Sequence, residues 1–273
     1  MDKRRRKKSK DLLFLFLLVF LCAIAAISFF MILSQFFEAK REQEAFEELS
    51  NIIPYHYIDE ESATDKGDLP LKNPDNATEN GDSPVNPYAE LAQRNPDFAA
   101  WLQMPGTNVN YPVMFTPDKP EYYLRRAFDR SASISGTPFI GADASLDSDC
   151  FIIYGHKMKN GSMFGTLEYY TGPEFWSQQK YFTLDTVDEQ RIYEIFAVVK
   201  TKILAADTLD FQYYRYTGAL SDSKFSELTE WLRGQSLYDT KINPVYGEQI
   251  LILSTCSYHT ENGRLIVAAR KVK

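Results

Sequence analysis

The sequence predicts a mainly β protein, a β-barrel or β-sandwich with helical insertions, preceded by one transmembrane helix. The first observation is a set of segments rich in β-branched and aromatic residues, which is typical of strands. These segments are 109–114, 151–155, 191–204, 249–256 and 264–272. The second observation is a long uncharged segment near the N-terminus. Helical patterns are few, and the last predicted strand lies at the C-terminal end of the sequence. Both observations favour a barrel or a sandwich.

The N-terminal region has the pattern of a membrane anchor. Residues 12–33 contain no charged side chain and follow a basic tail, residues 1–11. As a helix they would reach roughly 33 Å at about 1.5 Å per residue, enough to cross a bilayer. A cleaved signal peptide is the alternative, but its apolar region should span only about 7–15 residues. Seven Lys and Arg residues in the tail predict that the N-terminus stays in the cytoplasm and the remainder lies outside.

A stalk and an acidic linker, residues 34–85, are predicted between the anchor and one folded domain, residues 86–273. The charged segment 38–49 is predicted to continue the helix. Residues 59–87 are acidic and rich in Pro, Asn, Asp, Gly and Ser, a composition that is typical of a linker.

The predicted domain contains helical segments in two places. Two Asn-Pro pairs within residues 86–104 each suit the start of a helix, so we predict two short helices there. A long excursion, 205–248, contains a helical pattern at 223–232 and precedes the strand predicted at 249–256.

Charge and cysteine content narrow the possible classes of function. Beyond the first ten residues the chain has 23 basic and 36 acidic side chains, which argues against nucleic acid as a partner. Only Cys150 and Cys256 lie beyond the anchor, so no disulfide framework is indicated, although one bridge between them is arithmetically possible. With three histidines and no CxxC or HExxH pattern, we expect neither a metal nor an organic cofactor.

Three residues at strand ends suggest covalent catalysis. One predicted strand ends at Cys256, and an earlier one delivers His156 into a loop. A strand end is a rigid place for a nucleophile, and a cysteine next to a histidine is a common nucleophile and base. Arg264 begins the strand after a turn, so pairing of the two strands would bring it close to Cys256. Taken singly, each has an ordinary alternative: a buried thiol, a surface histidine and a surface arginine.

Several segments together resemble the sortase family of cysteine transpeptidases. The sequence LSTC at 253–256 is similar to the family signature TLxTC, with Ile252 at the position where the family usually has Thr. The sequence YGHKM at 154–158, followed by GSMF, resembles the histidine segment of class B sortases. Residues 95–113 are similar to the N-terminal helix and first strand of that class, and Arg264 follows the cysteine at a fitting distance.

The resemblance covers roughly residues 86–273 and carries expectations about fold and chemistry. It implies a closed β-barrel with N-terminal helices and a helical insertion before the cysteine strand. It also implies Cys256 as nucleophile, His156 as proton-transfer partner and Arg264 as oxyanion stabiliser. The implied partners are surface proteins cleaved after Thr in a C-terminal sorting motif, with a cell-wall peptide amine as acceptor. A Gram-positive cell surface is the implied location.

Three alternatives stay open on the sequence. A class B enzyme that polymerises pilins would use a pilin Lys as the acceptor amine. A thiol hydrolase or endopeptidase would resolve the thioester with water. A non-catalytic anchored wall-binding protein would hold Cys150 and Cys256 as a disulfide.

The insertion 205–248 is expected to set peptide specificity, because it separates two strands at the active end of the barrel. Tyr213 and Tyr214 are its predicted substrate-binding residues. They belong to an aromatic group with Phe211 and Tyr216, and such groups more often serve packing than recognition.

Substrate contacts are also predicted on either side of the insertion. Ser254 alternates onto the same face as Cys256 and, with Thr255, is predicted to contact the bound peptide. Leu124 is a further candidate for the wall of the peptide groove.

Overall fold

The computed structural model describes residues 2–53, 57–58, 71–72, 86–203, 210–257 and 260–273. Most of the predicted linker and the first residues of the predicted insertion therefore lie outside the described residues. The chain forms two compact units, Met1–Glu47 and Glu48–Lys273.

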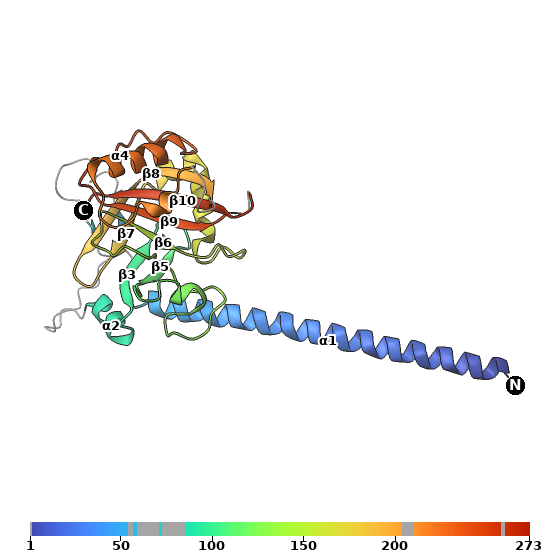
Figure 1. Cartoon of the computed structure of the whole chain (residues 1–273). Coiled ribbons are helices and arrows are strands. Elements are labelled where there is room, and N and C mark those ends of the chain that lie inside the picture. The colour runs from blue at the N-terminus through green and yellow to red at the C-terminus, as the bar shows by residue number, and fades with distance from the viewer. Residues whose placement is uncertain (1, 54–56, 59–70, 73–85, 204–209, 258–259) are drawn as a thin grey trace. The chain divides into compact units, whose positions relative to one another are not determined.

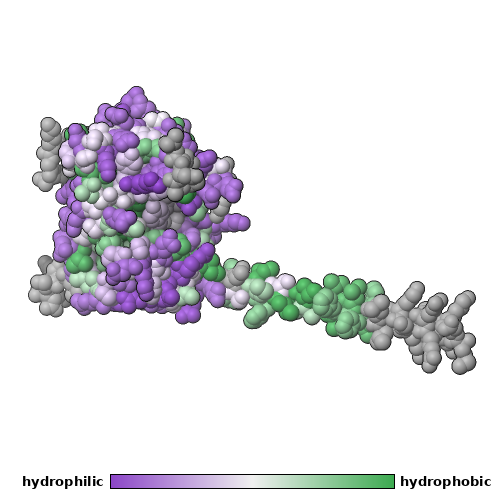
Figure 2. All heavy atoms as spheres, viewed as in Figure 1, coloured by the Kyte–Doolittle hydropathy of each residue, from purple (hydrophilic) through white to green (hydrophobic). Residues whose placement is uncertain are grey.

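The first unit is one helix. Helix α1 spans Asp2–Ser50, so the predicted anchor 12–33 and the predicted helical stalk 38–49 are continuous. Large apolar side chains between Phe14 and Phe37 are exposed along it, as the green surface in Figure 2 shows. By length and composition the helix is able to cross a membrane.

The second unit is built on a closed β-barrel (Figure 1), as the family resemblance implied. Around the barrel the strands follow the order β10-β8-β7-β3-β4-β5-β6-β9. Their bounds are β3 Phe98–Gln103, β4 Asn110–Met114, β5 Phe139–Ile140, β6 Cys150–Tyr154, β7 Tyr181–Asp185, β8 Gln190–Lys202, β9 Ile250–Cys256 and β10 Gly263–Lys271. All five strands predicted from the sequence are present.

Helices and short turns of 3-10 helix connect the strands. They are α2 Pro87–Arg94, η2 Tyr122–Arg125, η3 Phe164–Thr171, α3 Pro173–Gln178, η4 Tyr213–Arg215 and α4 Asp222–Gly234. Outside the barrel, β1 Tyr57–Ile58 pairs with β2 Leu71–Lys72. Helix α4 confirms the helical pattern predicted inside the insertion.

Of the two helices predicted at the start of the domain, one is present and one is a strand. Asn86 caps α2 by accepting hydrogen bonds from the backbone of Tyr88 and Ala89, as its Asn-Pro pair suggested. The second Asn-Pro pair leads instead into β3, which pairs with β4 on one side and β7 on the other. These non-local pairings outweigh the local helix signal, and the prediction of a second helix was wrong.

The barrel wall separates two apolar cores. Alternate side chains of the central strands face either the barrel interior or α4, which lies over β8 and β10 in Figure 1. The outer set includes Ile152 and Ile252, which belong to one buried cluster with Phe225 and Leu228 of α4. Because Cys256 follows Ile252 by four residues, alternation along β9 places it on this outer side.

We predict that residues 48–273 fold without the helical first unit. The expected product is a water-soluble protein whose thermal midpoint lies within about 4 °C of that of the full-length chain in detergent, the shift that roughly 1 kcal/mol produces at this size. Circular dichroism melting of both proteins gives the comparison. A non-cooperative melt of the shortened protein would contradict the prediction.

Candidate functional site

The strand register sets two of the predicted catalytic residues, Cys256 and Arg264, directly opposite each other. Strand β9 lies between β6 and β10, and Cys256 is paired directly with Arg264 on β10. The predicted pairing of these two strands is thereby confirmed. On the other side, β6 runs parallel to β9 with Tyr154 opposite Ser254. Strand β6 ends at Tyr154, so His156 lies two residues beyond it, in the loop that leaves the same end of the barrel at which β9 ends with Cys256.

Hydrogen bonds join the ends of β6 and β9 at this end of the barrel. The Thr255 hydroxyl donates to the Gly155 carbonyl at 2.7 Å, and the Gly155 backbone N–H donates to the Ser254 carbonyl at 3.2 Å. A Cβ atom at Gly155 would lie 2.7 Å from the ring of Phe164, so this position has no room for a side chain. The loop that carries His156 is therefore fixed to the strand that carries the cysteine.

The imidazole of His156 is held by a backbone carbonyl. Its Nε2 lies 2.8 Å from the Leu124 carbonyl oxygen, and a carbonyl only accepts, so Nε2 carries the proton. In the neutral ring the lone pair is then on Nδ1, the nitrogen that is able to act as a base.

The electrostatic surroundings favour the neutral form of this ring. Burial lowers the pKa of His156 below its ordinary value; the Leu124 hydrogen bond opposes this effect, and the nearby Arg125 charge adds to it. A neutral imidazole is the form that is able to take a proton from a thiol.

Arg264 is half-buried among tyrosines on the outer side of the barrel. One of its terminal nitrogens, Nη1, donates to the Gly263 carbonyl at 3.0 Å. Burial raises the pKa of Tyr154 and of Tyr213, and the positive charge of Arg264 acts against that rise in both. The sequence analysis did not predict Tyr154 as a residue of the site. Its position in β6, two residues before His156, was the signal that could have indicated it.

Two predicted substrate-binding residues are buried and bound to each other. The Tyr213 and Ser254 hydroxyl oxygens lie 3.0 Å apart, and both side chains are almost fully covered. Thr255 is also buried, and its hydroxyl is engaged by Gly155. Their hydrogen bonds join the insertion and the histidine loop to β9, and their contact with a peptide stays a prediction.

The aromatic group of the insertion serves mainly as packing. The ring of Phe211 stacks on Tyr216 and on Trp231 of α4, with centroids 4.6 Å apart in each pair. Tyr214 meets Tyr213 edge to face and is only half-buried. Tyr214 and Leu124, whose side chain is 36% exposed, keep their place as candidate walls of a peptide groove.

Cys150 and Cys256 lie at opposite ends of their strands. Cys150 pairs with Ile250 at the start of β9, six residues before Cys256, or roughly 20 Å at about 3.3 Å per residue. All three cysteines of the chain are free, and burial strongly raises the pKa of Cys150. The alternative of a Cys150–Cys256 disulfide is therefore wrong for this fold.

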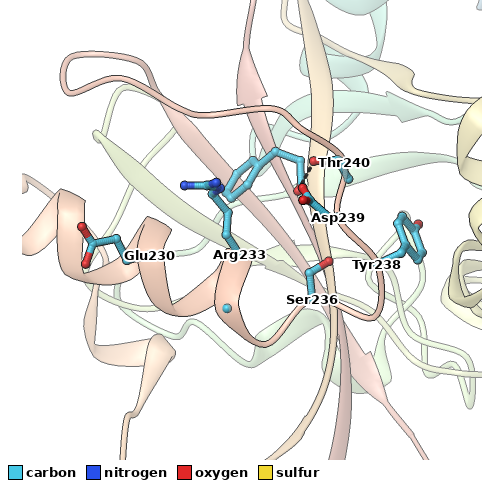
Figure 3. Close-up of a pocket in the computed structure, with 8 residues that line it drawn as sticks. Glu230, Arg233, Ser236, Tyr238, Asp239 and Thr240 are labelled. Carbon is cyan, nitrogen blue, oxygen red and sulfur yellow. Dashed lines mark hydrogen bonds between the residues drawn. The ribbon is translucent and has the colours of Figure 1, made fainter.

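A separate cavity of about 360 Å³ lies at the C-terminal end of α4 (Figure 3). Arg233 and Asp239 point into it from the helix end and from the segment that follows. Phe196 of β8 also lines it. None of the predicted catalytic residues lines this cavity, so it is distinct from the cluster at the end of β9.

Comparisons with known proteins agree with this fold. A family model described as a sortase domain matches residues 102–272. The chain is 30% identical over 188 residues to sortase B of Listeria monocytogenes, covering 67% of this chain and 73% of that protein. To sortase B of Staphylococcus aureus it is 26% identical over 190 residues, covering 68% and 75%. The solved structure of sortase B from B. anthracis in complex with AAEK1 has a TM-score of 0.65 and 28% identity, covering 87% of this chain and 99% of that chain.

The chain therefore belongs to the sortase family of cysteine transpeptidases, and the relatives it matches are class B sortases.

The lowered pKa of His156 makes stability depend on pH in a defined direction. Since the folded-state pKa lies below the ordinary value of 6.5, the unfolded chain binds the proton more readily. The contribution of His156 is then fully present above about pH 6.5 and is lost as the pH falls toward the folded-state pKa. We expect denaturant midpoints of the wild type to fall over this interval more steeply than those of His156→Gln. If the denaturant midpoints of the two proteins changed identically with pH, the lowered pKa of His156 would be contradicted.

Proposed function

We propose that this chain is a membrane-anchored, extracytoplasmic transpeptidase that cleaves a C-terminal sorting motif after Thr and transfers the protein to an amine of the cell wall. The observation that carries the proposal is the register of β6, β9 and β10, which pairs Arg264 with Cys256 and brings Tyr154, two residues before His156, opposite Ser254. Membership of the sortase family supports it.

In the first half of the reaction, Cys256 becomes acylated. His156 takes the thiol proton on Nδ1, and the sulfur attacks the carbonyl carbon of the Thr in the sorting motif. The guanidinium of Arg264 stabilises the negative oxygen of the tetrahedral intermediate. When the peptide C–N bond breaks, the imidazolium returns its proton to the departing amine, and the Thr carbonyl remains bound to sulfur as a thioester.

In the second half, an amine replaces sulfur on the acyl group. The acceptor nitrogen attacks the thioester carbonyl, and His156 removes a proton from it. Arg264 again stabilises the oxygen of the intermediate, and its collapse forms a new amide bond. The sulfur leaves and recovers the proton from His156, so Cys256 returns as a thiol.

The anchor has a positional role in this proposal. The basic tail favours a cytoplasmic N-terminus, so the barrel lies outside the membrane. A tether that holds the enzyme near membrane-held substrates raises their effective concentration without any new contact.

Replacing the nucleophile tests the proposal directly. In the full-length chain in detergent, Cys256→Ala should abolish cleavage of a sorting-motif peptide, because no thioester can form. The matched control Cys150→Ala should keep most of the turnover, since that thiol is buried at the start of β6, opposite Ile250 at the other end of β9 from Cys256. Products are separated by chromatography and identified by mass. Full turnover by Cys256→Ala would exclude the assignment.

The same assay, run with a panel of acceptor amines, distinguishes the related activities. Transfer to cell-wall stem peptides is the expected result. Preferential transfer to a Lys-containing pilin peptide would indicate pilus polymerisation, and release of free acid alone, with every amine ignored, would indicate a thiol hydrolase.

Arg264→Lys should lower kcat, because the Lys ammonium lacks the planar set of N–H donors of the guanidinium. The expected loss of transition-state stabilisation is about 2–4 kcal/mol. Arg270→Lys is a matched control on the same strand: Arg270 pairs with Glu194 and Glu248, away from the cysteine level. Its kcat should stay close to that of the wild type. Equal effects of the two substitutions on kcat would mean that Arg264 has only a structural role.

A further inference from the structure

The Leu124 carbonyl that holds His156 is itself carried by a short segment. It belongs to η2, only four residues long, within the connection from β4 to β5. A carbonyl on such a segment keeps its direction only if its neighbours hold it. The structure shows two supports for the Leu124 peptide group, one at Tyr123 and one at Gly136.

The first support is the buried side chain of Tyr123. Its hydroxyl donates to Asp97 Oδ2 at 2.7 Å and accepts from Asn95 Nδ2 at 2.8 Å. Arg130 completes the group, with its Nη2 atom 2.9 Å from Asp97 Oδ2 and 3.1 Å from Asn95 Oδ1. Because Tyr123 is fully buried, this network fixes the residue directly before Leu124 to the entry of β3.

The second support is Gly136. A side chain at this position would clash with the Leu124 carbonyl oxygen, and glycine has none. A Cβ atom at this position would lie 2.5 Å from the Leu124 carbonyl oxygen and 2.8 Å from that of Tyr123. The backbone at Gly136 has a φ of +61°, in the left-handed region that favours glycine. The next residue, Thr137, donates its N–H to the Tyr123 carbonyl at 3.1 Å.

We propose that Tyr123 and Gly136 are positioning residues, which aim the Leu124 carbonyl at His156 and thereby select the imidazole form with its lone pair on Nδ1. Neither residue touches the reacting atoms. Their effect passes through one hydrogen bond, from His156 Nε2 to Leu124. The proposal rests on the proposed role of His156 as the proton-transfer partner.

The test uses two substitutions in the full-length chain in detergent micelles, each with a matched control. Tyr123→Phe removes the hydroxyl; its control is Tyr88→Phe, since Tyr88 is a covered tyrosine that also donates to an aspartate, Asp185, at 2.7 Å. Gly136→Ala adds the clashing Cβ; its control is Gly247→Ala, at φ +98° with nothing within 4 Å of the added atom.

Two quantities are measured for each protein. Ring-15N histidine labelling, with the His156 signal assigned by its loss in His156→Gln, reports which imidazole nitrogen carries the proton. Peptide turnover gives kcat and KM. For Tyr123→Phe and Gly136→Ala we expect part of the His156 population to move to the Nδ1–H tautomer, with kcat lower by about tenfold to a hundredfold and KM nearly unchanged. The controls should match the wild type.

An unchanged His156 tautomer in either folded variant would overturn the proposal, as would an altered tautomer without any loss of kcat. Should Gly136→Ala not fold, Tyr123→Phe alone decides, because it removes one oxygen atom and adds no clash. The tautomer readout does not depend on turnover. A wild type that transfers no peptide, yet shows the expected tautomer change in the variants, would separate failure of the proposed function from failure of this proposal.

Discussion

The pairing of β9 with a parallel neighbour on one side and an antiparallel neighbour on the other is the constraint on which the site depends. Antiparallel pairing with β10 sets Arg264 directly opposite Cys256, and parallel pairing with β6 sets Tyr154, two residues before His156, opposite Ser254. A shift of either pairing by one residue would turn the side chains to the other face of the wall. The closed barrel resists such a shift, because each strand is paired on both sides and its alternate side chains are buried in two cores.

The surroundings of these residues suit a reaction in which one proton moves between sulfur, histidine and amine. Burial lowers the pKa of His156 and so favours the neutral base, while the Leu124 carbonyl fixes its proton on Nε2. On the other side, Arg264 lies among tyrosines whose pKa values are raised by burial, so these hydroxyls stay neutral and do not compensate the guanidinium charge. That charge remains available to an oxyanion.

Local patterns in the sequence were enough for five of the eight barrel strands, because each of these is a clear apolar run; β3, β5 and β7 were not predicted as strands. The roles of Cys256, His156 and Arg264 stay predictions. Features that depend on distant pairing were not predictable. The second Asn-Pro pair has the same local signal as the first, and only the pairing of β3 with β4 and β7 decides that a strand follows it. Alternation correctly placed Ser254 on the face of Cys256, but it gave no sign that Tyr213 covers that hydroxyl. The Leu124 carbonyl is a backbone group that every residue possesses, so its contact with His156 had no signal in the sequence.

The most direct test of the central claim is a disulfide between the two strand ends. Neighbouring strands lie about 4.8 Å apart, and a disulfide joins Cα atoms separated by about 4.4–6.8 Å. In a full-length chain carrying Cys150→Ala and His156→Cys, mild oxidation followed by peptide mapping should show the introduced thiol at position 156 linked to Cys256. The thiol introduced by Lys159→Cys in the same background, three residues further along the exposed loop, should stay free. Efficient linkage from position 159 and none from position 156 would contradict the register that builds the site.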